Sequence, residues 1–188
     1  VVVFDKSRGV GGRTATRRCG DYRFDHGAQY FTAREGSFRS KVEHWLKLGI
    51  VEAWQGEVGV WESTGISKSS EPPTRYVGVP GMTAMAKELA EGLDVRLQEK
   101  VVRATPTDGG WHLGSERELG HFEWVVSSLP PAQASALFAE HSVLKDRLEK
   151  AVMSPCWAGM VVLPSRLETP WDALFVNEGP LRWVARNN

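Results

Sequence analysis

The run VVVFD at residues 1–5 places the strongest constraint on the fold, because four consecutive apolar residues end at a carboxylate. An apolar run without polar alternation predicts a strand covered on both faces, which is typical of parallel sheets in α/β folds. An acidic residue that ends the second strand of a dinucleotide-binding unit holds the adenosine ribose. Asp5 is therefore a candidate ribose ligand. An ordinary core strand that ends in a solvated carboxylate is the alternative.

A basic loop rich in glycine follows the predicted strand. Gly9, Gly11 and Gly12 have no Cβ atom, so their backbone can approach a ligand closely, and N–H groups exposed in such loops suit phosphate oxygens. The guanidinium fork of arginine matches the geometry of pyrophosphate. The arginines of this region are Arg8, Arg13, Arg17 and Arg18. The loop thus predicts a pyrophosphate site, and a flexible loop with a solvated basic face is the alternative.

Two segments, DKSRGVGGRTATRR and RFDHGAQYFTAR, resemble the renalase-like branch of the FAD-dependent amine oxidoreductases. The resemblance continues through YVGVPGMTAMAKELAEGL, VVSSLPPAQ and PWDALFVNEGPLRWVARNN, so it covers nearly the whole chain. It implies that Asp5 binds the ribose, that residues 8–13 pass the pyrophosphate and that residues 25–30 pass the flavin ring. The family also has an N-terminal G-x-G-x-x-G unit and a further C-terminal segment. We therefore expect this chain to be a fragment of a longer flavoprotein.

The resemblance implies FAD as the cofactor and a set of residues that contact it. In the second motif, Gly27 and Ala28 are small enough to admit the ring, and Gln29 can hydrogen-bond it. The predicted FAD-binding residues are Asp5, Lys6, Arg8, Gly11, Gly12, Arg13, Gly27, Ala28, Gln29, Tyr30, Val102, Ser128 and Pro130. Tyr76 and Trp183 are predicted walls for a flat heteroaromatic substrate, because aromatic faces stack on such rings. Simple core packing is the alternative for both.

The activity that the resemblance implies is oxidation of misreduced dihydronicotinamide isomers, the 2- or 6-dihydro forms of NAD(P). Hydride passes to the flavin, and dioxygen reoxidises the flavin to give hydrogen peroxide. Because the cofactor supplies this chemistry, no residue is predicted to act as a catalytic acid or base. The sequence also contains no G-x-S-x-G motif. Two alternatives stay open: an amine oxidase acting on a primary or secondary amine, and a non-catalytic domain with a nucleotide-binding fold.

Composition limits the partners and the location. The 23 basic and 23 acidic side chains cancel, so no overall field attracts nucleic acid or an anionic membrane. Cys19 and Cys156 match no C-x-x-C pattern and are predicted to be free, buried or half-buried thiols in a reducing cytosol. The five histidines lack ligand spacing, so no metal site is predicted. The predicted partners are a small-molecule substrate, which is a reduced nicotinamide or an amine, and dioxygen, in the cytoplasm.

The predicted fold class is α/β. A Rossmann-like FAD-binding domain, with a parallel sheet and a β-meander, is interleaved with a mixed-sheet α+β substrate domain. The FAD-binding domain is assigned residues 1–35 and 79–130, and the substrate domain residues 36–78 and 131–188. Residues 63–74 are predicted as an exposed loop, and TPTDGG at residues 105–110 as a turn.

Periodicity predicts four helices. Ser37 is the predicted cap of the first, whose apolar face is Phe38, Val42, Trp45 and Leu46, with Gly49 after its end. The second has the stripe Met82, Met85, Ala86 and Leu89 before Gly92. Its methionines are predicted to pack in the core rather than to face a flavin. Two short helices are predicted within residues 131–151. Strands are predicted at residues 50–54, 57–62, 101–104, 111–113, 122–127, 156–163, 173–176 and 181–186, and near Val95.

Overall fold

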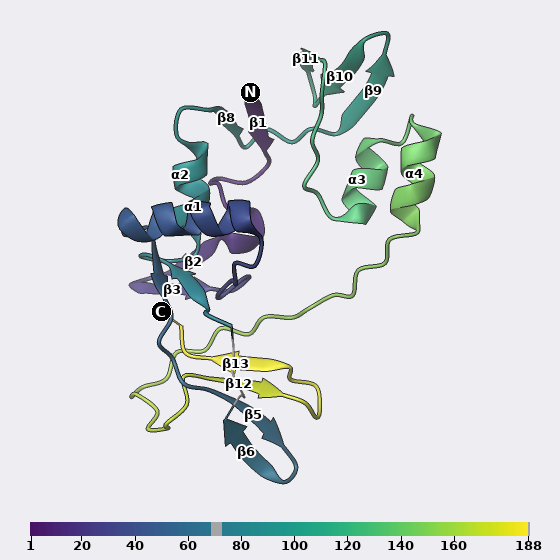
Figure 1. Ribbon diagram of the computed structural model, residues 1–188. Coiled ribbons are helices and arrows are strands. Elements are labelled where there is room, and N and C mark those ends of the chain that lie inside the picture. The colour runs from purple at the N-terminus through teal and green to yellow at the C-terminus, as the bar shows by residue number, and fades with distance from the viewer. Residues whose placement is uncertain (69–72, 188) are drawn as a thin grey trace. The chain divides into compact units, whose positions relative to one another are not determined.

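The structure, a computed structural model, describes residues 1–68 and 73–187 of the chain. It has mixed α/β architecture with several small sheets (Figure 1). The chain forms two compact units, the first of residues 1–10 and 92–157 and the second of residues 11–91 and 158–188. The domain ranges expected from the sequence differ from these units and stay a prediction.

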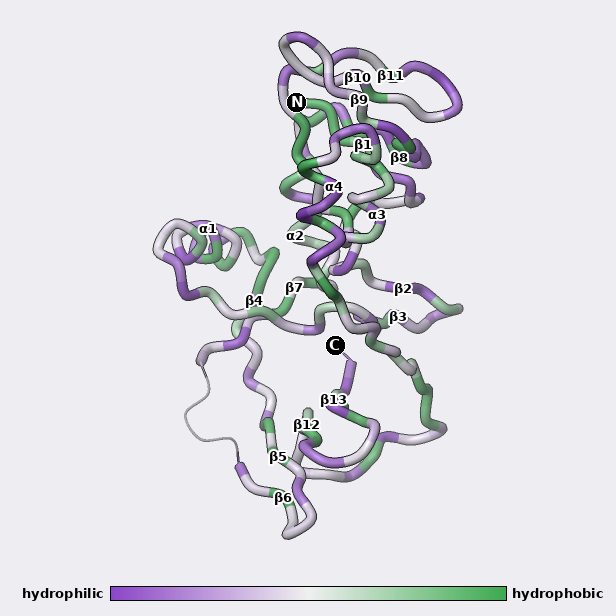
Figure 2. Tube along the Cα trace, turned by 90° about the vertical axis from the view of Figure 1, so that its right-hand side faces the viewer, coloured by the Kyte–Doolittle hydropathy of each residue, from purple (hydrophilic) through white to green (hydrophobic). Residues whose placement is uncertain are grey.

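The first unit contains the parallel pair that the opening run predicts. Strand β1 (Val2–Asp5) pairs in parallel with β8 (Asp94–Leu97), with Val3 opposite Val95. Most of β1 is strongly hydrophobic (Figure 2). The expectation that both faces are covered is wrong for the described residues, because all four residues of β1 are half-buried. Among those residues, β8 is its one neighbouring strand.

The rest of the first unit is a three-stranded meander with two helices. Strands β9 (Arg103–Thr107), β10 (Gly110–Gly114) and β11 (Glu118–Phe122) are antiparallel. Helices α3 (Pro131–Leu137) and α4 (Ser142–Glu149) confirm the two short helices. The buried core of this unit consists of Ala104, Leu113, Ala134, Leu137 and Phe138. Apolar side chains from β9, β10 and α3 therefore hold the meander and helices together.

Two apolar runs predicted as strands form no strand of their own. In the first, predicted at residues 122–127, Phe122 is the last residue of β11. Residues 123–127 have no ladder partner, and Trp124 and Val126 are 86% and 95% exposed. Residues 156–163 are likewise outside any strand, and Trp157 is 97% exposed. Apolar content alone favours a strand, but a strand also needs a neighbouring edge for its backbone hydrogen bonds. No described strand supplies that edge to either run.

The second unit is built from helices, hairpins and a mixed sheet. The helical elements are η1 (Gly12–Thr14), α1 (Gly36–Lys47) and α2 (Thr83–Ala90). One hairpin joins β2 (Thr16–Cys19) and β3 (Tyr22–Asp25). Antiparallel β4 (Val51–Ala53) and β7 (Tyr76–Gly78) form a second pair. The four-stranded sheet has the order β13 (Trp183–Ala185), β12 (Ala173–Val176), β5 (Val58–Glu62) and β6 (Gly65–Lys68).

The apolar stripes of α1 and α2 meet in one core. The buried members of this core are Val42, Trp45, Val51, Val77, Met82 and Met85, so core packing of the methionines is confirmed. Leu89 is 53% exposed, because α2 is short and its last turn extends past the core. The expected Ser37 cap is wrong. The helix begins at Gly36, with Glu35 in the extended conformation before it.

Two segments predicted as a loop and a turn also contain hairpin strands. Residues 65–68 form β6 against β5, and Gly65 has φ +130° beside the turn. Residues 69–72 of that predicted loop lie outside the described residues. In the segment 105–110, Thr105 and Thr107 belong to β9 and pair with His112 and Gly110 of β10. The turn is confined to Asp108 and Gly109. Cross-strand pairing therefore extends the strands into sequences whose composition favours turns.

Candidate functional site

Asp5 ends β1 in a turn that fixes its carboxylate. Its Oδ1 accepts the backbone N–H of Ser7 at 2.8 Å. Its carbonyl oxygen accepts from Glu99 N–H at 3.1 Å, and the Ser7 carbonyl accepts from Gln98 N–H at 3.0 Å. Oδ2 has no hydrogen bond to any described residue. Asp5 is half-buried, so this oxygen can accept a hydrogen bond from a ligand hydroxyl.

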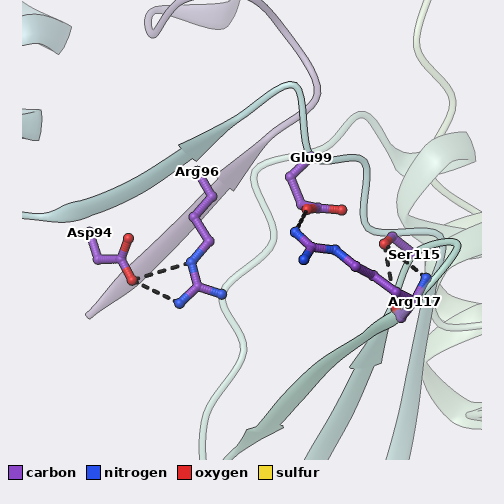
Figure 3. Close-up of polar contacts among 5 residues, drawn as sticks. All are labelled: Asp94, Arg96, Glu99, Ser115 and Arg117. Carbon is purple, nitrogen blue, oxygen red and sulfur yellow. Dashed lines mark hydrogen bonds and ion pairs between the residues drawn. The ribbon is translucent and has the colours of Figure 1, made fainter.

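An ion pair holds the segment that bonds to the Asp5 backbone. Arg117, in the turn between β10 and β11, donates from Nη2 to Glu99 Oε2 at 2.5 Å (Figure 3). The hydrogen bond from Arg117 lowers the pKa of Glu99 below its ordinary value, and the same bond raises the pKa of Arg117. Both groups therefore stay charged near neutral pH, and the turn after β8 is tied to the meander.

The glycine loop is open and basic. Gly11 and Gly12 have φ values of +120° and +51°, a region that side chains with a Cβ rarely adopt. A Cβ built on Gly12 would meet no atom within 4 Å, so the space beside it is open. The side chains of Lys6, Arg8 and Arg13 are exposed and make no hydrogen bond or ion pair with a described residue. These cations are available for an anionic ligand.

The two motifs of the resemblance meet within the second unit. Arg13 accepts the backbone N–H of Ala28 through its carbonyl oxygen at 3.0 Å. A Cβ built on Gly27 would lie 2.1 Å from the same carbonyl oxygen. Only glycine allows this approach. The structure therefore joins the end of the glycine loop to the segment that carries Gln29 and Tyr30.

Asp25 is a buried residue whose hydrogen bonds hold the segments around this junction together. The sequence did not predict this role. Asp25 is 3% exposed, and its Oδ1 accepts from Thr16 Oγ1 at 2.5 Å and from Met82 N–H at 3.1 Å. Its own N–H donates to Asn187 Oδ1 at 2.7 Å. Thr83 Oγ1 accepts the N–H of Thr16 at 2.6 Å. The β2–β3 hairpin is thus bonded to the start of α2, and no local sequence signal distinguishes this carboxylate from a solvated one.

Four half-buried rings, Tyr30, Trp54, Phe175 and Trp183, form what we call the aromatic cluster. The centroid of Trp183 lies 4.6 Å from Phe175 and 5.5 Å from Tyr30. Tyr30 and Trp54 are stacked, with centroids 6.0 Å apart. Trp183 Nε1 donates to Gln29 Oε1, which fixes both side chains. Two members of the cluster, Tyr30 and Trp183, were predicted site residues. The other two, Trp54 and Phe175, were not predicted because they lie far apart in the sequence.

Tyr76 lies outside the aromatic cluster. Its ring centroid is 5.6 Å from Phe31, and the two residues exchange backbone hydrogen bonds at 2.9 Å. It packs against the buried core of the second unit. The structure therefore brings Trp183, but not Tyr76, to the cluster.

The remaining predicted FAD contacts belong to the first unit. Val102 precedes β9 and donates its N–H to Gly114 at 2.9 Å, with its side chain 50% exposed. Ser128 is exposed in the irregular segment after β11, and Pro130 is the residue before α3. Their contact with a cofactor stays a prediction.

Other expected features concern cysteines, metals and membranes. Cys19 and Cys156 are free, but both are exposed, so the expected burial is wrong. Cys19 lies in a two-stranded hairpin and Cys156 in an irregular segment. Neither segment is covered by another described sheet layer at its cysteine. Within the described ranges, no group of three or more histidine, cysteine or acidic side chains is arranged to hold a metal ion. In the same ranges, no helix combines the length and apolar character needed to cross a membrane.

A comparison with protein families bears on the first part of the chain. Residues 1–45 match the NAD(P)-binding Rossmann-like domain. The matched range contains Asp5, the glycine loop and residues 25–30. The match does not separate FAD from NAD(P). It supports a dinucleotide cofactor, and over these residues the chain is similar to dinucleotide-binding oxidoreductases.

Proposed function

We propose that the chain is part of an FAD-dependent oxidoreductase that oxidises dihydronicotinamide isomers. The observation that carries this proposal is the junction of Arg13 with Gly27 and Ala28. It connects a glycine loop suited to phosphate directly to a segment that continues into Gln29, which accepts from Trp183 of the aromatic cluster, and Tyr30, which belongs to that cluster. In the second unit, the residues proposed to bind phosphate therefore lie next to the residues proposed to bind the flavin ring.

The residues fit a dinucleotide. The open Oδ2 of Asp5 can accept from a ribose hydroxyl, a charge-assisted bond. Arg13 is an unpaired cation next to Gly12, whose open surroundings leave room for phosphate oxygens. Lys6 and Arg8, in the first unit, are likewise exposed cations. Each unit by itself therefore carries groups of the kinds that a dinucleotide requires.

When bound, FAD would supply the redox chemistry, accepting a hydride from the substrate and passing electrons to dioxygen. The residues of the protein then bind the cofactor and the substrate and orient the two rings. Gln29 Oε1 is engaged by Trp183, which leaves the amide NH₂ of Gln29 as a donor for a ring acceptor. The faces of Tyr30 and Trp183 offer stacking area to a flat ring.

The charge of the cluster favours a nicotinamide ring over an amine substrate. Aromatic faces attract cationic amines, but the guanidinium of Arg75 already lies 5.2 Å from the centroid of Tyr30 and 5.8 Å from that of Phe175. A second cation at these rings would be repelled. A neutral ring avoids this repulsion.

Titration of FAD, NAD⁺ and NADP⁺ into the longer protein of which this chain is proposed to be a part tests the cofactor. We expect FAD to bind most tightly. Asp5→Ala should weaken FAD binding by roughly 2–4 kcal/mol, because charge-assisted hydrogen bonds are lost. Arg13→Ala should weaken it more than the matched control Arg18→Ala, which removes an exposed arginine from β2. Equal losses at both arginines, or binding of NAD(P)⁺ without FAD, would contradict the assignment.

Anaerobic mixing of the FAD-loaded protein with candidate substrates tests the reaction. Flavin absorbance should be bleached faster by a 2- or 6-dihydronicotinamide than by benzylamine or a polyamine. Bleaching by the amines alone would replace the proposed substrate with an amine. A protein that binds no flavin at any concentration would support the non-catalytic alternative.

A further inference from the structure

Arg75 is a buried cation fixed beside the aromatic cluster. It directly precedes β7 and is only 9% exposed. Its carbonyl oxygen accepts the N–H of Trp54 at 2.8 Å, which continues the ladder between β4 and β7. Its guanidinium lies against the rings of Tyr30 and Phe175. The backbone and two rings therefore determine where this charge sits.

Among the residues that the structure describes, none is an anionic partner for the guanidinium of Arg75. Its side chain makes no hydrogen bond or ion pair with a described residue, and its Nε is buried without a partner. A buried charge without hydrogen bonds is costly. Attraction to ring faces offsets part of this cost but supplies no acceptor for the in-plane N–H donors. An oxygen acceptor from outside the chain would complete the site.

Arg96 in the first unit shows what a satisfied arginine of the same kind looks like. Its guanidinium lies 5.4 Å from the ring centroid of Phe4, a geometry close to that of Arg75. It also donates to Asp94 Oδ2 from Nε at 3.3 Å and from Nη2 at 2.9 Å (Figure 3). Its side chain is 42% exposed. Arg75 therefore differs from Arg96 in its burial and in having no described carboxylate partner, whereas both arginines contact a ring.

We propose that Arg75 and the aromatic cluster bind a planar ring that carries an acyl oxygen, and that a ring carboxylate binds more tightly than its amide. The rings provide stacking surface, and the donor fork of Arg75 provides paired hydrogen bonds to the oxygen. The link to catalysis rests on the proposed function, since a dihydronicotinamide carries a carboxamide oxygen. Arg75 would then be a specificity-determining residue for that substituent.

Calorimetric titration of the 188-residue chain, without FAD, tests the site with four probes: nicotinate, nicotinamide, pyridine and inorganic phosphate. We expect nicotinate to bind about tenfold more tightly than nicotinamide, because its bond to the guanidinium joins two charges. Nicotinamide should bind more tightly than pyridine, which lacks the acyl oxygen. Arg75→Met should abolish the preference for nicotinate and leave pyridine binding within about threefold of its original value.

Two further variants control for charge and folding. Arg96→Met removes the paired arginine at the other ring and should leave the order of all four probes unchanged. Arg75→Lys keeps the charge but not the planar fork, so part of the nicotinate preference should remain. Thermal unfolding of each variant checks its structure. If Arg75→Met does not fold, the order of the probes in the unmodified chain and in Arg75→Lys decides the question.

Several outcomes would overturn the proposal. They are equal affinity for nicotinate and pyridine, no measurable binding of any ring probe, a nicotinate preference that persists in Arg75→Met, and tighter binding of inorganic phosphate than of nicotinate. The last would identify a phosphate site instead. Because no probe requires FAD, the two proposals can fail separately. Nicotinate binding through Arg75 in this chain, together with a longer parent protein whose flavin is never bound or reduced, would refute the proposed function alone.

Discussion

Asp5 and Asp25 both end a strand and both lie in a motif of the resemblance, yet the fold treats them differently. Asp25 is 3% exposed and accepts two hydrogen bonds from the hairpin and the start of α2. Asp5 is half-buried, and its carboxylate accepts one bond from its own turn. One carboxylate is therefore part of the scaffold, and the other is left open for a ligand. Position after a strand does not determine the role; the partners that the fold supplies do.

The largest effect should come from the junction that Asp25 supports. Gly27→Ala would place a Cβ 2.1 Å from the Arg13 carbonyl oxygen, so the backbone would have to move. We expect it to lower the free energy of unfolding by about 4 kcal/mol or more, measured by urea denaturation. Gly36→Ala is the matched control, because its Cβ would meet no atom within 4 Å at the start of α1. A similar loss in both variants would remove the argument that the junction requires glycine.

Alanine substitutions of Asp25 and Asp5 should lower the free energy of unfolding by clearly different amounts. Asp25→Ala removes the acceptor of the Thr16 hydroxyl and of the buried Met82 N–H, so it should cost about 2–4 kcal/mol of unfolding free energy. Asp5→Ala removes one bond within an open turn and should cost less than about 1 kcal/mol. The same denaturation curves measure both. If Asp5→Ala destabilises the chain as much as Asp25→Ala, Asp5 is structural and its assignment as a ribose ligand fails.

A third carboxylate, Glu88, should show the smallest effect and a dependence on pH. Glu88 accepts from Lys41 Nζ at 2.9 Å and from Trp45 Nε1 at 2.8 Å, and the Lys41 bond is the largest cause that lowers its pKa below 4.5. A lowered pKa in the folded state stabilises the fold above the unfolded pKa, and this contribution is lost as the pH falls through the folded pKa.

The difference in Tm between the unmodified chain and Glu88→Gln should therefore be greatest above about pH 5 and shrink as the pH falls below the unfolded value near 4.5. Thermal unfolding across this range measures it. Glu91→Gln, at an exposed residue just after α2, is the control and should show no such trend. A Tm difference for Glu88→Gln that grows with falling pH would show that the pKa shift has the opposite sign.

Several elements could be predicted because their signals are local. The run VVVFD predicts a strand, and β1 pairs in parallel with β8. The stripe of Val42 and Trp45 predicts the buried face of α1. The prediction failed at Trp124 and Trp157, which also lie in apolar runs but are exposed. A strand needs a partner edge, and apolar content alone cannot say whether one is present.

The sequence by itself determined the chemistry that the chain can offer: an acidic strand end, a basic glycine loop and the Gln29–Tyr30 segment, all within residues 1–45 that match a Rossmann-like domain. Tertiary structure alone decided which of these groups are committed to the scaffold. It buried Asp25, brought the backbone of Gly27 close to the carbonyl oxygen of Arg13, and placed the guanidinium of Arg75 against the rings of Tyr30 and Phe175. The physical reason is that burial and hydrogen-bond partners come from residues distant in the chain. The sequence gives each residue its polar groups. The free-energy cost of leaving such a group without a hydrogen bond depends on the residues that the fold places around it.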